Sequence, residues 1–306
     1  MASKQKIIPN LWFDREAEEA ANLYVSTFEN SKVLSVTRAG KAGFETTGIP
    51  EGTVMTAEFE LEGQRFIGIN GGPLFKFTPA ISFLISCDTK QRVDEIWSKL
   101  SPGGKVLMEL GAYPFSERYG WTQDRYGLSW QVMFSGGRTV DQKITPTLMF
   151  VGALAGRAEE AIKLYTSVFS NSSIGNITRY PKGPGPDKEG TIVNASFVLE
   201  HYALAAMDSA LQHDFTFTEA ISLMVECETQ EEIDYYWGRL TGDGGRESMC
   251  GWLYDKFGVS WQVTPTVLGK MLQDPDKSKV ERVTNAFLKM KKFDIAALRR
   301  AFEGNG

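Results

Sequence analysis

Two short stretches hold the side chains best suited to chemistry. Residues 126–132 read Tyr-Gly-Leu-Ser-Trp-Gln-Val, and residues 257–263 read Phe-Gly-Val-Ser-Trp-Gln-Val. Each follows an Asp and a basic residue, a composition typical of a tight turn in which glycine takes a positive φ. Apolar and polar residues then alternate, which predicts a half-buried strand. Gln131 and Gln262 therefore lie on the strand face opposite the tryptophan, where an amide can hydrogen-bond a ligand.

The elements that position these glutamines occur twice along the chain. In each copy a short apolar strand leads into a helix with apolar residues at helical spacing, then a strand and a two-stranded hairpin. The pattern starts again at 77–82 and at 217–222, so each copy reads β-α-β-β-β twice. We predict an α+β fold with two tandem domains and a C-terminal helical extension. The expected boundaries are residues 5–135, 143–272 and 276–304.

Composition excludes several classes of protein. The 306 residues carry a net charge of -5, with 42% hydrophobic and 23% charged residues, which is typical of a packed globular protein. We see no basic stripe with interleaved aromatics, no apolar run of bilayer length and no signal-peptide core. The three cysteines are expected to be reduced. The chain is therefore expected to be cytoplasmic, without nucleic-acid or membrane partners.

The motifs of both copies resemble the vicinal oxygen chelate superfamily, which includes glyoxalase I, bleomycin-resistance proteins and extradiol dioxygenases. The PhnB-like branch, which bears the name 3-demethylubiquinone-9 3-methyltransferase, is closer still. The strings that carry this resemblance include 17–20 (Ala-Glu-Glu-Ala), 70–73 (Asn-Gly-Gly-Pro) and 251–262. Relatives with one unit per chain pair as homodimers. The resemblance thus implies either a monomer with an internal pseudo-dimer or a homodimer.

Metal-dependent relatives hold a divalent ion in a cup formed by two modules, through His and Glu side chains at four strand positions. A transition ion prefers imidazole, thiolate or carboxylate ligands, whereas Asn, Ser, Thr and Gln bind it poorly. The chain has two histidines, His201 and His213, both in the second copy. We therefore expect no metal. The resemblance carries the four positions onto these residues: Asn10, Asn70, Ser82, Gln131, Thr147, Asp208, Ser222 and Gln262.

Aromatic side chains near the same positions are candidates to line the cups, with core packing as the alternative. They are Trp12, Phe77, Trp121, Phe217 and Trp252. No GxGxxG motif is present for a nucleotide cofactor, so no cofactor is expected.

We interpret the chain as a metal-independent protein that binds a small organic molecule in the cup of each domain. It is either a sequestering protein or an enzyme of unknown reaction. The alternative is an enzyme proper, namely a metal-dependent lyase or dioxygenase, or the methyltransferase of the branch's name.

The two cups are not expected to be equivalent. Gly104 and Trp121 are 17 positions apart, whereas Gly245 and Trp252 are 7 positions apart. Long loops at the mouth of a site often act as lids. The alternative is that the extra residues pack against the other copy or the C-terminal extension.

Overall fold

The computed structural model describes residues 5–40, 50–138 and 140–304. The first copy contains two βαβββ modules, as the periodicity predicts. Its elements are β1 (Ile7–Phe13), α1 (Ala17–Thr27), β2 (Lys32–Arg38), β3 (Val54–Leu61), β4 (Gln64–Asn70), β5 (Ile81–Cys87), α3 (Lys90–Leu100), β6 (Lys105–Tyr113), β7 (Ser116–Gln123) and β8 (Ser129–Phe134).

The second copy repeats this order and is followed by the C-terminal helices. The elements are β9 (Ile144–Val151), the short helix η1 (Gly152–Leu154), α4 (Ala158–Val168), β10 (Ser173–Arg179), β11 (Ile192–Leu199), β12 (Tyr202–Ser209), β13 (Ile221–Cys227), α5 (Gln230–Thr241), η2 (Gly242–Gly244), β14 (Arg246–Glu247), β15 (Trp252–Tyr254), β16 (Ser260–Pro265), α6 (Thr266–Leu272), α7 (Lys277–Phe287) and α8 (Ile295–Glu303).

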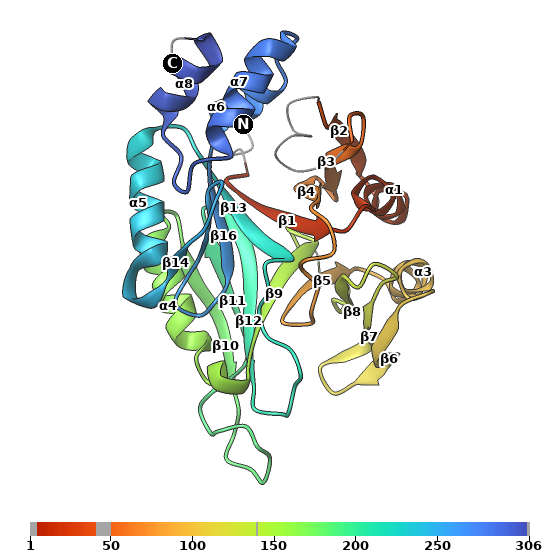
Figure 1. The fold of residues 1–306 in the computed structure, drawn as a ribbon. Helices are drawn as coiled ribbons and strands as arrows, with labels where there is room; N and C mark the ends of the chain where they lie inside the picture. The colour runs from red at the N-terminus through yellow and green to blue at the C-terminus, as the bar shows by residue number, and fades with distance from the viewer. Residues whose placement is uncertain (1–4, 41–49, 139, 305–306) are drawn as a thin grey trace.

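Each eight-stranded sheet combines one module from each copy (Figure 1). Sheet A has the order β14-β15-β16-β13-β1-β4-β3-β2, and sheet B has the order β10-β11-β12-β9-β5-β8-β7-β6. The copies meet where β1 lies antiparallel to β13 and where β5 lies antiparallel to β9. The expectation of one cup inside each domain is therefore wrong, since each sheet is shared. Periodicity fixes the strands of a module, but it does not say which module supplies the neighbouring strand.

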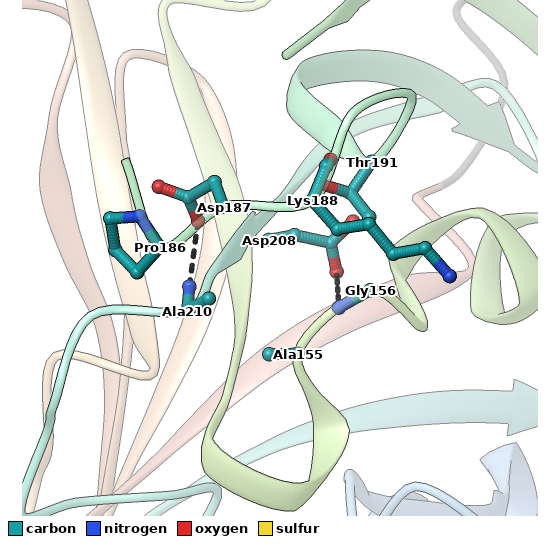
Figure 2. A pocket seen from close by; sticks show the side chains of 8 residues that line it. All are labelled: Ala155, Gly156, Pro186, Asp187, Lys188, Thr191, Asp208 and Ala210. Atoms are coloured by element: carbon teal, nitrogen blue, oxygen red, sulfur yellow. Dashed lines mark hydrogen bonds between the residues drawn. The ribbon is translucent and has the colours of Figure 1, made fainter. Parts of the chain in front are cut away.

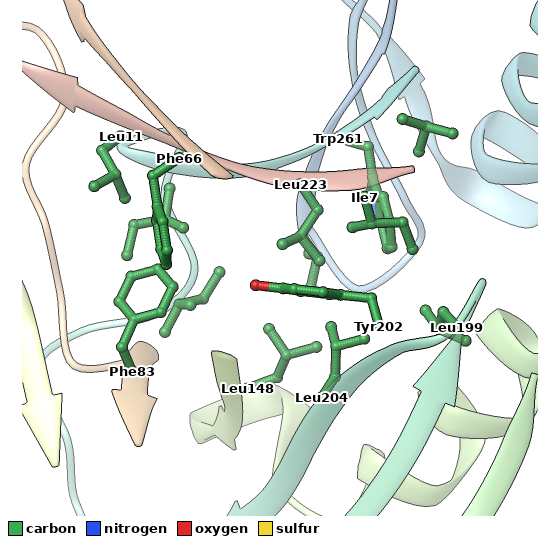
Figure 3. Close-up of a cluster of buried hydrophobic side chains, with 14 of the residues drawn as sticks. Ile7, Leu11, Phe66, Phe83, Leu148, Leu199, Tyr202, Leu204, Leu223 and Trp261 are labelled. Carbon is green, nitrogen blue, oxygen red and sulfur yellow. The ribbon is translucent and has the colours of Figure 1, made fainter. Parts of the chain in front are cut away.

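The hydrophobic core lies between the two sheets. Figure 3 shows side chains of sheet A, such as Ile7 and Phe66, directed toward side chains of sheet B, such as Phe83 and Leu148. The rings of Phe66 and Phe83 meet edge to face with centroids 5.5 Å apart. Because side chains alternate along a strand, the residues between these core positions point to the outer face of each sheet.

We call these outer faces face A and face B. Face A carries Ile8, Asn10, Trp12, Ser222, Met224, Trp252, Ser260 and Gln262. Face B carries Ser82, Tyr119, Trp121, Ser129, Gln131, Thr147 and Met149.

The repeated turn motif joins the end of each copy to its first helix. Asp124 accepts hydrogen bonds from the backbone N–H groups of Tyr126 (2.8 Å) and Leu128 (3.1 Å), and from Tyr24 Oη (2.7 Å) and Trp130 Nε1 (2.8 Å). Burial raises the pKa of this carboxyl, although all four hydrogen bonds oppose the shift. The motif is therefore a buried polar clamp between sheet B and α1.

The clamp recurs in the second copy. Asp255 accepts from Tyr165 Oη (2.6 Å) and Trp261 Nε1 (3.0 Å), as well as from the N–H groups of residues 257 and 259. The glycines of both turns take the expected positive φ, 88° at Gly127 and 80° at Gly258. The sequence expectation for these turns is thus confirmed, while the strands at 77–82 and 217–222 begin later than expected, at Ile81 and Ile221.

Candidate functional site

Face B brings together four of the expected site residues. Gln131 Nε2 donates to Ser82 Oγ at 2.8 Å, and Ser82 pairs with Thr147 across the junction between β5 and β9. Trp121 Nε1 donates to Ser129 Oγ at 2.8 Å. All of these polar groups lie on the same face, in a stretch where Gln131 is only 8% exposed.

A tyrosine completes the network of face B. Tyr119 Oη donates to Gln131 Oε1 at 2.7 Å, and burial raises the pKa of this phenol. Tyr119 was not expected among the site residues. The signal that could have indicated it is its place two positions before Trp121 on the same strand face. With this bond, both ends of the Gln131 amide are satisfied by protein groups.

Face A has the same Gln–Ser hydrogen bond but lacks the hydrogen bond from a tyrosine. Gln262 Nε2 donates to Ser222 Oγ at 2.8 Å, and Ser222 pairs with Asn10 across the junction between β1 and β13. The position two before Trp252 is Cys250, which lies outside the strand and has a φ of 57°. Gln262 therefore has no tyrosine donor equivalent to that of Gln131.

Two further polar atoms of face A have no partner among the described residues. They are Asn10 Oδ1 and Ser260 Oγ, and both are buried. The counterpart of Ser260 is Ser129, which accepts the tryptophan N–H of face B. On face A the tryptophan instead meets another indole: Trp252 packs edge to face on Trp12, with centroids 6.0 Å apart.

Aromatic side chains border face A. Trp12 donates its Nε1 hydrogen to the carbonyl of Gly72 at 2.8 Å, and its ring meets Phe75 with centroids 4.9 Å apart. A Cβ at Gly71 would lie 2.0 Å from the Trp12 ring, so the glycine allows the backbone after β4 to cross closely over this indole. The corresponding residue of face B is Met149, which has no ring.

Two expected site residues lie elsewhere because they cap backbone groups. Asn70 Oδ1 accepts from the N–H of Ala17 at 2.8 Å, at the start of α1. Asp208 Oδ1 accepts from Gly156 (2.8 Å) and Ala158 (3.0 Å) at the start of α4. The hairpin strand β4 instead directs Ile67 and Ile69 to face A, because the strand alternates. The placement of Asn70 and Asp208 toward the cups is therefore corrected.

Phe77 and Phe217 also lie away from the outer faces. Phe77 packs edge to face on Phe13 at 5.2 Å, and Phe217 packs in the same way on Phe150 at 5.2 Å. Phe13 and Phe150 belong to the core between the sheets. For these two aromatics the core-packing alternative holds.

A small hollow of about 210 Å³ lies beside Asp208. Figure 2 shows the hydrogen bonds that Asp208 and Asp187 make with backbone N–H groups at its wall. The second oxygen of Asp208 accepts from the N–H of Ile192 at 2.9 Å. Its carboxylate oxygens are thus committed to the starts of α4 and β11.

The residues do not fit a transition-metal site. Across the described parts of the chain, no group of three or more His, Cys, Asp or Glu side chains could hold a metal ion. Asn10, Ser222 and Gln262 on face A offer amide and hydroxyl groups, which are poor ligands for such an ion. His213 instead lies 2.9 Å from Ser209 Oγ, and His201 occupies the hairpin turn with a φ of 64°.

Comparisons with known proteins agree with the duplicated fold. A family model described as 3-demethylubiquinone-9 3-methyltransferase matches residues 5–133 and again 142–264. A putative 3-demethylubiquinone-9 3-methyltransferase, PhnB protein, from Bacillus cereus is 41% identical over 43% of this chain and 100% of its own, with a TM-score of 0.40. Glyoxalase I from Zea mays is 13% identical over 88% of this chain and 98% of its own, with a TM-score of 0.54.

No curated protein matches the chain. In the ranges that the structure describes, the helices are too short or too polar to cross a membrane.

Proposed function

Because the chain belongs to the 3-demethylubiquinone-9 3-methyltransferase family, with two tandem domains of the glyoxalase fold, we propose that it binds a small organic molecule without a metal. The observation that supports this most is a glutamine amide bonded to a serine hydroxyl in the middle of each outer face. Such groups suit hydrogen bonding to an uncharged or anionic ligand. The protein then acts as a binding or sequestering protein, or as an enzyme whose reaction is still to be identified.

The neutral donor set favours this function over a metal-dependent lyase or dioxygenase. An amide resembles a carboxylate in shape but lacks its negative charge. At a separation of about 4 Å and an effective dielectric near 20, that charge is worth several kcal/mol of attraction to a divalent ion. Elemental analysis of protein purified without a metal-affinity tag is expected to find no stoichiometric zinc, nickel, iron or manganese. One such ion per domain would contradict the proposal.

The binding itself is tested by ligand-observed NMR with a set of neutral and anionic fragments. We expect hits that weaken or disappear in the double variant Gln131→Ala, Gln262→Ala. Gln91→Ala is the matched control, because Gln91 lies exposed on α3 and bonds to Glu95. A fragment profile that is identical in the wild type and the double variant would overturn binding at these faces. Calorimetry with S-adenosylmethionine tests the methyltransferase alternative, for which we expect no heat of binding.

The pairing of two copies in one chain also bears on assembly. Every sheet junction that joins the copies is made within the chain. We propose that the protein works as a monomer with an internal pseudo-dimer, which light scattering can distinguish from a homodimer.

A further inference from the structure

We propose that face A alone is the ligand site, and that it takes one uncharged ring compound carrying a hydroxyl or amide N–H donor. This inference rests on the proposed function and sharpens it from two equivalent faces to one. It starts from a difference in hydrogen bonding: equivalent polar side chains of the two faces have partners on face B but not on face A.

On face B both ends of the central amide are already bonded to protein groups. Tyr119 donates to Gln131, Gln131 donates to Ser82, and Trp121 donates to Ser129. A ligand here would have to break these bonds and replace each of them, which gives no net gain from the polar groups.

Face A keeps acceptors that nothing in the described chain satisfies. Asn10 is 3% exposed and Ser260 is 0% exposed, yet Asn10 Oδ1 and Ser260 Oγ have no partner. Buried polar atoms of native proteins are nearly always paired, so an unpaired one calls for an explanation. An acceptor such as Asn10 Oδ1 is complemented by a donor, and this is why the ligand must carry O–H or N–H.

The charges of face A favour an uncharged ligand. Its guanidinium groups have partners: Arg65 of β4 is flanked by Glu58 and by Glu226, and Arg246 of β14 lies over the ring of Tyr254. The side chains around Asn10 are Ile8, Ile67, Ser222 and Met224, and none carries a charge. An ion placed among them would lose its hydration without gaining a counter-charge.

The aromatic border favours a ring. Trp12, Phe75 and Trp252 meet edge to face on this side of sheet A. Trp12 and Trp252 are only half-buried, and Trp12 lies two positions after Asn10 on the same strand face. A ring bound beside Asn10 can therefore pack against these indoles. Binding should therefore change tryptophan fluorescence.

The test uses three naphthalene probes that differ in one group. The first is 2-naphthol, which is uncharged at pH 7 and donates one hydrogen bond. The second is 2-methoxynaphthalene, which lacks the donor, and the third is 2-naphthoate, which is an anion. We expect 2-naphthol to bind with a stoichiometry of one per chain, and the other two to bind at least about tenfold more weakly. That factor corresponds to about 1.4 kcal/mol, a typical value for a hydrogen bond.

Matched variants locate the site. Asn10→Leu and Ser260→Ala should each weaken 2-naphthol binding about tenfold or more, whereas Thr147→Val, the counterpart of Asn10 on face B, should leave it unchanged. Asn10→Ser, a smaller polar change, covers the case in which the leucine variant does not fold. Two molecules per chain, or a loss in Thr147→Val only, would overturn the proposal.

The two proposals fail in different ways. If 2-naphthol does not bind while other fragments are lost in the glutamine double variant, the assigned ligand class is wrong and the proposed function stands. If no fragment responds to that double variant, both proposals are wrong.

Discussion

Faces A and B are each built from one module of either copy and carry matching residues, yet the central amide is bonded at both ends on face B, whereas face A keeps two unpaired polar atoms. On face B, the hairpin β6–β7 extends far enough to bring Tyr119 to Gln131. On face A, the equivalent strands β14 and β15 are short, and Cys250 takes the place that corresponds to Tyr119. The Gln–Ser hydrogen bond is therefore present on both faces. The length of the neighbouring hairpin decides whether a tyrosine also bonds the glutamine.

The C-terminal extension takes the place of part of that hairpin in the second copy. Arg118 of β7 pairs with Asp94 of α3 at 2.7 Å, and the matching Asp234 of α5 pairs instead with Lys292 beyond α7. The backbone N–H of Gly251 donates to Lys291 O at 2.7 Å. The hairpin that holds the ten extra residues thus contacts α3 of its own copy, and C-terminal residues make the matching contact in the second copy; the lid stays a prediction.

The largest expected effect tests what the two copies share. Asp124→Ala and Asp255→Ala each leave a buried tyrosine O–H, an indole N–H and two backbone N–H groups without an acceptor. We expect each to lower the free energy of unfolding by about 3 kcal/mol or more, because every unsatisfied buried donor costs about 1–3 kcal/mol. Urea titration monitored by circular dichroism measures this loss.

The milder variants Asp124→Asn and Asp255→Asn are the control, since an amide retains one acceptor oxygen. The comparison predicts similar losses in the two copies. A loss in one copy only would show that the shared frame is less equivalent than the repeated geometry indicates.

The sequence predicted this frame well because its signals are local. Turn glycines, strand alternation and helical spacing all act within a few residues, so the modules, their order and the neutral Gln, Ser and Asn positions could be placed. Two things could not be placed. The sharing of sheets between copies depends on contacts between residues far apart in the sequence, such as Ile81 with Leu148 and Ile7 with Val225. The outward strand face of β4 depends on a register that a one-residue shift inverts. Asn70 and Asp208 were misplaced for that second reason.

The next effect tests the closure of face B. Tyr119→Phe removes the O–H that donates to Gln131 Oε1 and keeps the ring, which packs edge to face on Tyr113 at 5.5 Å. The amide oxygen then loses its partner, so we expect a loss of about 1–2 kcal/mol in the free energy of unfolding. Tyr113→Phe is the matched control, because Tyr113 Oη bonds to the exposed backbone of Glu109. Equal losses in both variants would contradict a specific closing role for Tyr119.

The third effect has the opposite sign and tests the opening of face A. Asn10→Leu replaces a buried amide that has an unpaired oxygen by an apolar group of similar size. We expect the ligand-free protein to gain about 1 kcal/mol of stability, because an unsatisfied buried polar group is removed. Thermal unfolding measures the gain, with Thr147→Val expected to change the stability by less. A clear loss of stability in Asn10→Leu would show that the amide is satisfied in the folded protein.

The smallest expected effect concerns pH and an exposed cluster next to the second turn. Hydrogen bonds from Arg157 and Lys256 lower the pKa of Glu160 to about 2, below the usual value for this residue. Since the folded-state pKa lies below that of the unfolded chain, the stabilisation is present above the unfolded pKa and is lost as the pH falls toward 2. Glu160→Gln should therefore lower stability at pH 7 by no more than about 1 kcal/mol, because the pair is exposed and screened. The difference between variant and wild type should shrink between pH 5 and pH 2 in urea titrations, and a difference that grows on acidification would contradict the assigned direction of the shift.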